Sequence, residues 1–234
     1  MTVAPRLLLA LDVPTASAAL SMVDRFAGRC DFYKVGLELF MAAGPSLVGS
    51  LRARGLDVFL DLKLHDIPNT VRQAARQAAA HDVRLLTVHA SGGEAMLAAA
   101  VDGAGESCGV LGVTVLTSLA PAELAAAWGR GPWIDVRAEV LRLAGLADGA
   151  GAHGVVCSGA ELSAVVQQFE GRLAPLVPGV RPAGSSSNDQ VRVVTPEAAA
   201  AHGARYLILG RAVTEANDPV AAWDAIRSSV ATAG

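Results

Sequence analysis

The feature that most constrains this chain is an eightfold alternation of short apolar runs with longer segments of helical periodicity. The apolar runs are nearly continuous, as is typical of strands buried on both faces. The predicted strands are Leu7–Asp12, Phe32–Gly36, Val58–Lys63, Leu85–His89, Val110–Leu116, Gly154–Ser158, Leu173–Val177 and Tyr206–Gly210. The predicted helices between them span residues 15–27, 38–54, 68–81, 94–103, 135–148, 159–170, 195–202 and 218–231. Eight strand–helix units in 234 residues indicate an α/β fold, a (β/α)8 TIM barrel.

A doubly wound open sheet is the alternative fold. It usually has fewer strand–helix units, and it often carries a glycine fingerprint after its first strand, where this chain has Asp12, Val13 and Pro14. No linker divides the sequence, so we expect residues 1–234 to form a single domain. Residues 117–134 and 181–194 are longer than plain connections, and the polar second stretch is a candidate lid over residues 182–190.

The composition excludes several classes of protein. The chain has 19 basic and 22 acidic residues, a net charge of −3, so a dedicated nucleic-acid binder with a basic stripe is not expected. No apolar run reaches the roughly 18 residues of a membrane-spanning helix. The apolar run after Arg6 ends at Asp12 and is too short for a signal peptide. Because Cys30, Cys108 and Cys157 are odd in number and widely spaced, we expect free buried thiols and a cytoplasmic location.

Lysine is rare in this sequence. Of the 19 basic residues only Lys34 and Lys63 are lysines, and the other 17 are arginines. A position that keeps lysine in such a chain can require a compact ammonium that releases a proton, which arginine does not supply. The alternative is that two surface lysines persist by chance.

Polar side chains close most of the predicted strands. In a parallel barrel the active site lies at the carboxyl ends of the strands. The polar residues at these ends are Asp12, Lys34, Asp61, Lys63, Asp66, His89, Thr117, Ser118, Arg181 and Arg211. Because strand side chains alternate, Asp61 and Lys63 are predicted to point to the same side, close to Lys34 of the neighbouring strand.

The Asp61–Asp66 segment can be interpreted as structural or as catalytic. In the structural interpretation it is a solvated strand end with a salt bridge. Buried charges are costly unless they are paired, and the segment contains one of only two lysines, so the catalytic interpretation is favoured. His89, by contrast, is expected to be a structural residue, and the other histidines lack the spacing of metal ligands.

A phosphate site is predicted after the last two strands. Gly210 and Arg211 follow a buried apolar run and open a helix, and Arg181 follows the seventh strand. Backbone N–H groups and guanidinium groups at this place in a barrel are typical of phosphate binding. A glycine turn with a surface arginine is the alternative.

These residues together resemble the orotidine 5′-phosphate decarboxylases of the short bacterial type. The matching segments, which run along nearly the whole chain, are LALDVP at 9–14, KVG at 34–36, DLKLHDIPNTV at 61–71, HASGG at 89–93, LTS at 116–118, PGVRP at 178–182, DQVRVVTP at 189–196 and LGRAVT at 209–214. One departure is Ala212, where the family usually has proline. Alanine adds a backbone N–H that proline lacks, so the anion site should not suffer.

The resemblance implies a function and a set of site residues. The implied reaction is cofactor-independent loss of CO2 from orotidine 5′-phosphate to give uridine 5′-phosphate, the last step of de novo pyrimidine (UMP) biosynthesis, with no metal. Lys63 would protonate C6 within a charge array of Lys34, Asp61, Lys63 and Asp66. The family also implies a homodimer in which Asp66, Ile67 and Thr70 reach the partner's site. The remaining substrate contacts would come from Asp12 and Lys34 at the ribose, Thr117 and Ser118 at the base, and Arg181, Gln190, Gly210 and Arg211 at the phosphate.

Two other functions remain open from the sequence. Magnesium-dependent keto-sugar-phosphate decarboxylases and synthases share the barrel and the spacing of Asp61, Lys63 and Asp66. They are expected to place a glutamate on the second strand, where this chain has Lys34, whose ammonium would oppose a cation beside Asp61. The second alternative is a catalytically silent barrel that only binds a nucleotide monophosphate, which would not need the complete charge array.

Overall fold

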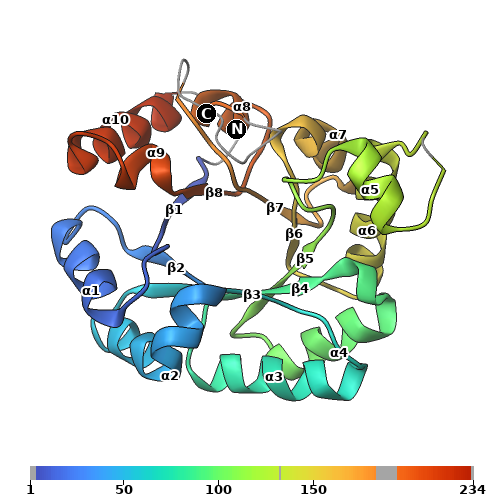
Figure 1. Ribbon diagram of the computed structural model, residues 1–234, viewed down its shortest axis with the longest axis horizontal. Helices are drawn as coiled ribbons and strands as arrows, with labels where there is room; N and C mark the ends of the chain where they lie inside the picture. The colour runs from blue at the N-terminus through green and yellow to red at the C-terminus, as the bar shows by residue number, and fades with distance from the viewer. Residues whose placement is uncertain (1–3, 132, 183–193, 233–234) are drawn as a thin grey trace.

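The computed structural model describes residues 4–131, 133–182 and 194–232. Its eight strands pair in parallel and in chain order, and β8 pairs back onto β1 to close the barrel (Figure 1). The strands are β1 (Arg6–Ala10), β2 (Phe32–Gly36), β3 (Asp57–Leu64), β4 (Leu85–His89), β5 (Gly109–Val113), β6 (Gly154–Val156), β7 (Ala174–Val177) and β8 (Tyr206–Leu209). The predicted (β/α)8 fold is confirmed.

The helices form a ring around the barrel (Figure 1). They are α1 (Ala16–Arg25), α2 (Leu37–Ala53), α3 (Pro68–Ala80), the short 3-10 turn η1 (Ala90–Gly92), α4 (Glu94–Ala104), α5 (Pro121–Ala127), α6 (Val136–Gly149), α7 (Gly159–Phe169), α8 (Pro196–Ala201), α9 (Arg211–Thr214) and α10 (Pro219–Thr232). The side chains of Thr15 and Thr195 cap α1 and α8 by accepting a hydrogen bond from the backbone three residues later. Gly44, with φ 61°, breaks α2 so that Pro45 begins its second half.

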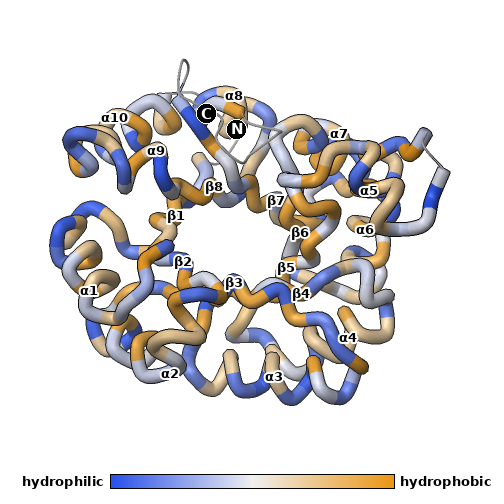
Figure 2. Tube along the Cα trace, viewed as in Figure 1, coloured by the Kyte–Doolittle hydropathy of each residue, from blue (hydrophilic) through white to orange (hydrophobic). Residues whose placement is uncertain are grey.

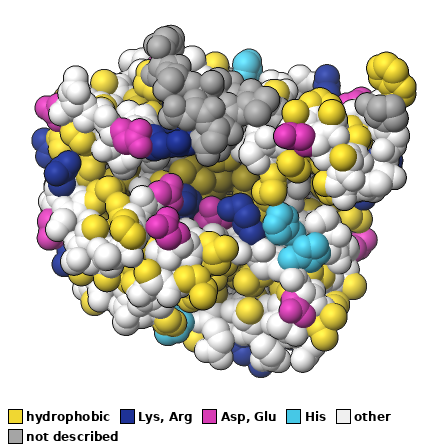
Figure 3. Space-filling model, in the orientation of Figure 1, with side chains coloured by type: hydrophobic (Ala, Val, Ile, Leu, Met, Phe, Trp, Pro, Cys, Tyr) yellow, Lys and Arg dark blue, Asp and Glu magenta, His cyan; other side chains and the backbone are white. Residues whose placement is uncertain are grey.

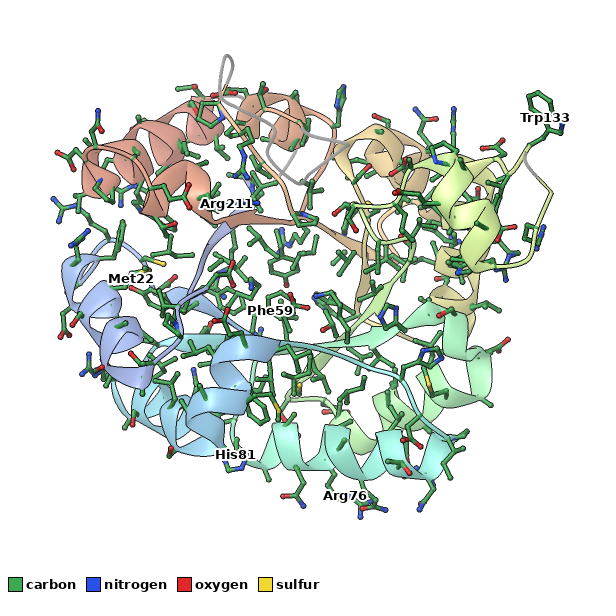
Figure 4. The ribbon with its side chains drawn as sticks, in the orientation of Figure 1. Met22, Phe59, Arg76, His81, Trp133 and Arg211 are labelled. Carbon is green, nitrogen blue, oxygen red and sulfur yellow. The ribbon has the colours of Figure 1, made fainter. Side chains whose placement is uncertain are left out.

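Both faces of the strands are buried, which explains their continuous apolar sequence. Figure 2 shows apolar residues along the strands of the barrel. One face fills the barrel interior with a small cluster, and the other packs against the helices. The interior cluster consists of Leu8, Ala10, Phe32, Phe59, Leu85, Leu111, Leu176, Tyr206 and Ile208. Phe59 lies in the middle of the barrel (Figure 4). Because side chains alternate along each strand, this cluster shows which later residues face the open end.

Four predicted strands extend further toward their carboxyl ends than the observed β1, β5, β6 and β8, whereas β3 is one residue longer than predicted at each end. Asp12, Leu116, Ser118 and Gly210 lie in the connections that follow β1, β5 and β8. All four of these residues line the cavity described below. The stretch 117–134 contains a helix of its own, α5, which the sequence pattern did not predict.

Other expectations concern the lid, the thiols and the membrane. Most of the candidate lid at 182–190 lies outside the described residues. All three cysteines are free and buried, as predicted. In the described parts of the chain, no helix is both long and apolar enough to cross a membrane.

Candidate active site

A cavity of about 330 Å³ opens at the carboxyl ends of the strands. Its polar lining residues are Asp12, Lys34, Asp61, Lys63, Thr117, Ser118, Arg181 and Arg211. Figure 3 shows acidic, basic and histidine side chains gathered around a hollow in the middle of this face. Gly210 also lines the cavity, so the structure brings together nine of the site residues that the sequence singled out, and they come from segments far apart in the chain.

Lys34 links two carboxylates at the base of this cavity. Its Nζ atom lies 2.7 Å from Asp12 Oδ1 and 3.9 Å from Asp61 Oδ2. The Lys34 side chain is only 10% exposed and Asp61 13%, whereas Asp12 is 62% exposed. A nearly buried ammonium is thus held between two carboxylates, and this pairing offsets the free-energy cost of removing its charge from water.

Lys63 reaches the same carboxylate group from the other side. Its Nζ atom donates a hydrogen bond of 2.8 Å to Asp61 Oδ1, and its side chain is 39% exposed at the cavity. The alternation argument placed both side chains on one side, and they do meet, but β3 is irregular at this point. Lys63 has φ 51°, a left-handed conformation that costs a non-glycine residue roughly 1–2 kcal/mol.

The irregularity of β3 arises from its pairing with β4. Leu60 pairs with Leu86, but Leu64 pairs with Val88, so three residues of β3 lie opposite Thr87 alone. Thr87 fills this gap with its hydroxyl group, which contacts both Lys63 and Asp61. Sequence reasoning missed Thr87, although a polar residue two positions after the inward-facing Leu85 was a usable signal.

Two histidines adjoin the lysine. The rings of His65 and His89 lie 5.5 Å apart between centroids and are tilted by 40°. Burial, and then the neighbouring His65 and Lys63, lower the pKa of His89, while Asp61 raises it. This environment favours the neutral imidazole of His89.

Two arginines define the opposite side of the cavity. Arg181 follows β7 and is 7% exposed, and Arg211 begins α9 directly after β8 (Figure 4). Burial, and then the charge of Arg211, lower the pKa of the Arg181 guanidinium, while Glu215 raises it. Since α9 has only four residues, the guanidinium groups supply most of the positive charge at this end.

Four predicted residues are not part of this cavity as described. Asp66, Ile67 and Thr70 are exposed on the segment between β3 and the first turn of α3, and Asp66 Oδ1 accepts a hydrogen bond of 2.6 Å from the Ile67 backbone. The fourth, Gln190, lies outside the described residues. The charge array within one chain thus consists of Lys34, Asp61 and Lys63, together with Asp12. Among the described residues, no group of three or more His, Cys, Asp or Glu side chains is placed to hold a metal ion.

Comparison with known proteins identifies the family. The profile of the Orotidine 5′-phosphate decarboxylase / HUMPS family matches residues 5–226. This chain belongs to that family. It is an enzyme of the carboxy-lyase class.

Individual relatives match almost the whole chain. The orotidine 5′-phosphate decarboxylase of Anaeromyxobacter sp. (strain K) is 51% identical over 96% of this chain and 98% of its own length. That of Halorhodospira halophila is 48% identical over 98% of both chains. Among solved structures, the orotidine 5′-phosphate decarboxylase of Lactobacillus acidophilus has a TM-score of 0.85 and 33% identity, covering 97% of this chain and 99% of its own. The resemblance drawn from the motifs is confirmed.

Proposed function

We propose that this enzyme decarboxylates orotidine 5′-phosphate to uridine 5′-phosphate and CO2 without a cofactor. The observation that carries the proposal is the Lys63 ammonium, which is hydrogen-bonded to Asp61 and faces a cavity lined on its far side by Arg181 and Arg211. A proton donor and an anion-binding pair in one cavity suit a substrate with a reacting ring and a phosphate. The names of the relatives support the same substrate.

The chemistry follows from what decarboxylation at C6 requires. The bond between C6 and the carboxylate breaks, CO2 leaves, and the electron pair remains on C6. No electron sink is available in the pyrimidine ring for that pair, so it must be stabilised by a positive charge and then protonated. Lys63 supplies both, first as a nearby ammonium and then as the acid, and it regains its proton from water.

The neighbouring groups keep the ammonium in place. Asp61 accepts a hydrogen bond from Lys63, and Lys34 balances the remaining charge of Asp61 while also pairing with Asp12. We assign Asp12 and Lys34 to the ribose hydroxyl groups, and Thr117 and Ser118 to the pyrimidine, because all four line the same cavity as Lys63 and the two arginines.

We assign Arg181, Gly210 and Arg211 to the phosphate, together with Gln190. The charge of Arg211 lowers the pKa of Arg181, so the two guanidinium groups lie close enough to repel each other, and a bound phosphate would reduce this repulsion. Because the phosphate does not react, its binding energy can offset the cost of enclosing a charged substrate.

We further propose a homodimer in which Asp66, Ile67 and Thr70 complete the partner's site. Asp66 is exposed and does not line the cavity of its own chain, and Ile67 is 66% exposed. Leu37 and Met41 are 58% and 77% exposed on α2, the helix that follows the neighbouring strand β2. Exposed apolar side chains beside the cavity mouth suit contact with another protein surface.

The buried free thiols are consistent with the reducing environment of the cytoplasm, so we place the enzyme there. We also propose that residues 1–234 form one domain and that the enzyme acts in pyrimidine biosynthesis.

The family description also covers enzymes of another type, and Lys34 argues against that chemistry here. A keto-sugar-phosphate enzyme would use Asp61 to bind Mg²⁺, but the Lys34 ammonium lies 3.9 Å from this carboxylate and carries the same sign of charge as the metal. The test is to add orotidine 5′-phosphate to the purified protein and follow its ultraviolet absorbance with and without a chelator. The proposal expects equal turnover in both samples. It fails if no orotidine 5′-phosphate is consumed or if the chelator abolishes turnover.

A further inference from the structure

Thr87 is a polar residue in the apolar strand β4. It is completely buried, it faces the barrel interior two residues after Leu85, and it is not among the residues that line the cavity. A buried hydroxyl group must find hydrogen-bond partners inside the protein. The partners of Thr87 are two groups of the neighbouring strand β3, and both belong to residues of the charge array.

The first partner is the backbone of Lys63. At the register shift, the Lys63 N–H group donates to Thr87 Oγ1 at 2.9 Å. In a regular parallel ladder this N–H would bond to a backbone carbonyl of β4. The Thr87 hydroxyl takes the place of that carbonyl, and it does so at the residue whose backbone is left-handed, with φ 51°. An unusual backbone conformation of this kind persists only where the surroundings fix it.

The second partner is the carboxylate of Asp61. Thr87 Oγ1 donates to Asp61 Oδ1 at 2.9 Å, and the same Oδ1 atom accepts the 2.8 Å hydrogen bond from Lys63 Nζ. A hydroxyl group has one proton to donate, so its acceptance from Lys63 N–H leaves the proton free for Asp61. One hydroxyl group thereby holds the main chain of the lysine and the carboxylate that its side chain contacts.

We propose that Thr87 is a positioning residue for the reaction: its hydroxyl fixes both ends of the Lys63 side chain, the backbone at one end and the carboxylate partner of the ammonium at the other. This inference rests on the proposed role of Lys63. A proton donor must be held close to its target geometry, because a displacement of about 1 Å can cost about a hundredfold in rate. Thr87 makes this contribution without touching the substrate.

Substitution of Thr87 by valine and by serine distinguishes the contribution of the hydroxyl group from that of the rest of the side chain. Thr87→Val keeps the shape and burial but removes both hydrogen bonds, so Lys63 N–H and Asp61 Oδ1 each lose a partner. Thr87→Ser keeps the hydroxyl and loses only a methyl group. The matched control is Thr114→Val, because Thr114 is also buried in the barrel wall and its hydroxyl donates at 2.8 Å to the Val156 carbonyl, away from the array.

The measurements are kcat and KM for orotidine 5′-phosphate, the inhibition constant of uridine 5′-phosphate, and amide hydrogen exchange at Lys63. We expect Thr87→Val to lower kcat by at least about tenfold while KM and the product inhibition constant stay within about threefold. Exchange at Lys63 should accelerate in this variant. Thr87→Ser should restore most of the rate and the slow exchange, and Thr114→Val should stay within about twofold of the parent kcat.

The proposal is overturned if Thr87→Val keeps the parent kcat, if it loses no more activity than Thr114→Val, or if Thr87→Ser is as impaired as Thr87→Val. A proportional loss of kcat and product binding would also overturn it, since that result indicates general damage. If Thr87→Val does not fold, Thr87→Ala is judged by the same criteria. Lys63→Ala is measured in parallel. If Lys63→Ala retains turnover, the proposed role of Lys63 is refuted. If Lys63→Ala loses turnover but Thr87→Val remains fully active, only the role of Thr87 is refuted.

Discussion

Lys63 Nζ lies 2.8 Å from Asp61 Oδ1, and both residues lie within the interruption of the β3–β4 ladder. The contact joins a partly exposed ammonium at the cavity to a carboxylate that is nearly buried and already paired with Lys34. The carboxylate is thus fixed on one side and offers its other oxygen to Lys63. A proton donor held in this way can approach a substrate atom without losing its own position.

Two substitutions of Lys63 should distinguish its role as a positive charge from its role as a proton donor. Lys63→Ala removes both, and Lys63→Arg keeps a positive charge but cannot release a proton, because guanidinium groups stay protonated in proteins. We expect both variants to lose at least about a hundredfold in kcat, the lower end of what a positioned acid contributes. Turnover is measured by ultraviolet absorbance and folding by circular dichroism. An arginine variant with near-parent kcat would show that charge alone is sufficient.

Arg211 should determine how strongly the phosphate group of the substrate raises kcat/KM. A hydrogen bond to a charged group contributes about 1.5–3 kcal/mol, so Arg211→Ala should lower kcat/KM for orotidine 5′-phosphate by about 10–100-fold. Orotidine, which lacks the phosphate, is the control substrate, and its kcat/KM should be the same in the parent and the variant. The assignment of Arg211 to the phosphate fails if both substrates lose activity equally.

Asp66 should act in the site of the partner chain. Lys63→Ala and Asp66→Asn chains are each inactive in this interpretation, but a hybrid dimer contains one site with both an intact Lys63 and an intact Asp66. An equal mixture that exchanges subunits should regain up to about a quarter of the parent activity. Activity is measured before and after exchange in mild denaturant. A mixture that stays inactive, although subunit exchange is demonstrated, argues against the shared site.

The sequence predicted the barrel because its signal is repeated in every strand. Each strand is apolar on both faces, and the bounds of β2 and β4 were predicted to the residue. The carboxyl ends were predicted less well. Asp12 and Gly210 come directly after an apolar run in the sequence and were predicted to end strands. In the structure they lie outside the strands, in connections that line the cavity.

The charges of the site were predictable, but the contacts that hold them were not. Asp61 and Lys63 could be placed together because both are polar residues at a buried strand end. The extra residues of β3 opposite Thr87 leave no mark on periodicity, since a register shift depends on how two strands pair. The one sequence signal for Thr87 is its hydroxyl group in an otherwise apolar strand, and this signal is weak because threonine is also a common β-branched strand residue.

His89 should make stability depend on pH. Its folded-state pKa is lowered by burial and then by the neighbouring His65 and Lys63, and its unfolded pKa is about 6.5. The unfolded chain therefore binds the proton first as the pH falls, so the contribution of neutral His89 is present above pH ~6.5 and is lost progressively below it. We expect Tm to fall as the pH decreases below ~6.5, and less steeply in His89→Gln, which does not titrate. Parallel Tm curves for the two proteins would contradict this assignment.

Two helix glycines should respond in opposite ways to alanine. A Cβ atom on Gly103 of α4 would lie 2.1 Å from the Arg72 carbonyl oxygen of α3, whereas one on Gly145 of α6 would meet no atom within 4 Å. Gly103→Ala must push two packed helices apart and should destabilise the fold by about 1–3 kcal/mol. Gly145→Ala removes only the helix penalty of glycine and should stabilise it by about 0.5–1 kcal/mol. Thermal and denaturant unfolding of both variants measure the difference, and shifts of the same sign would show that the α3–α4 contact does not limit the side chain at Gly103.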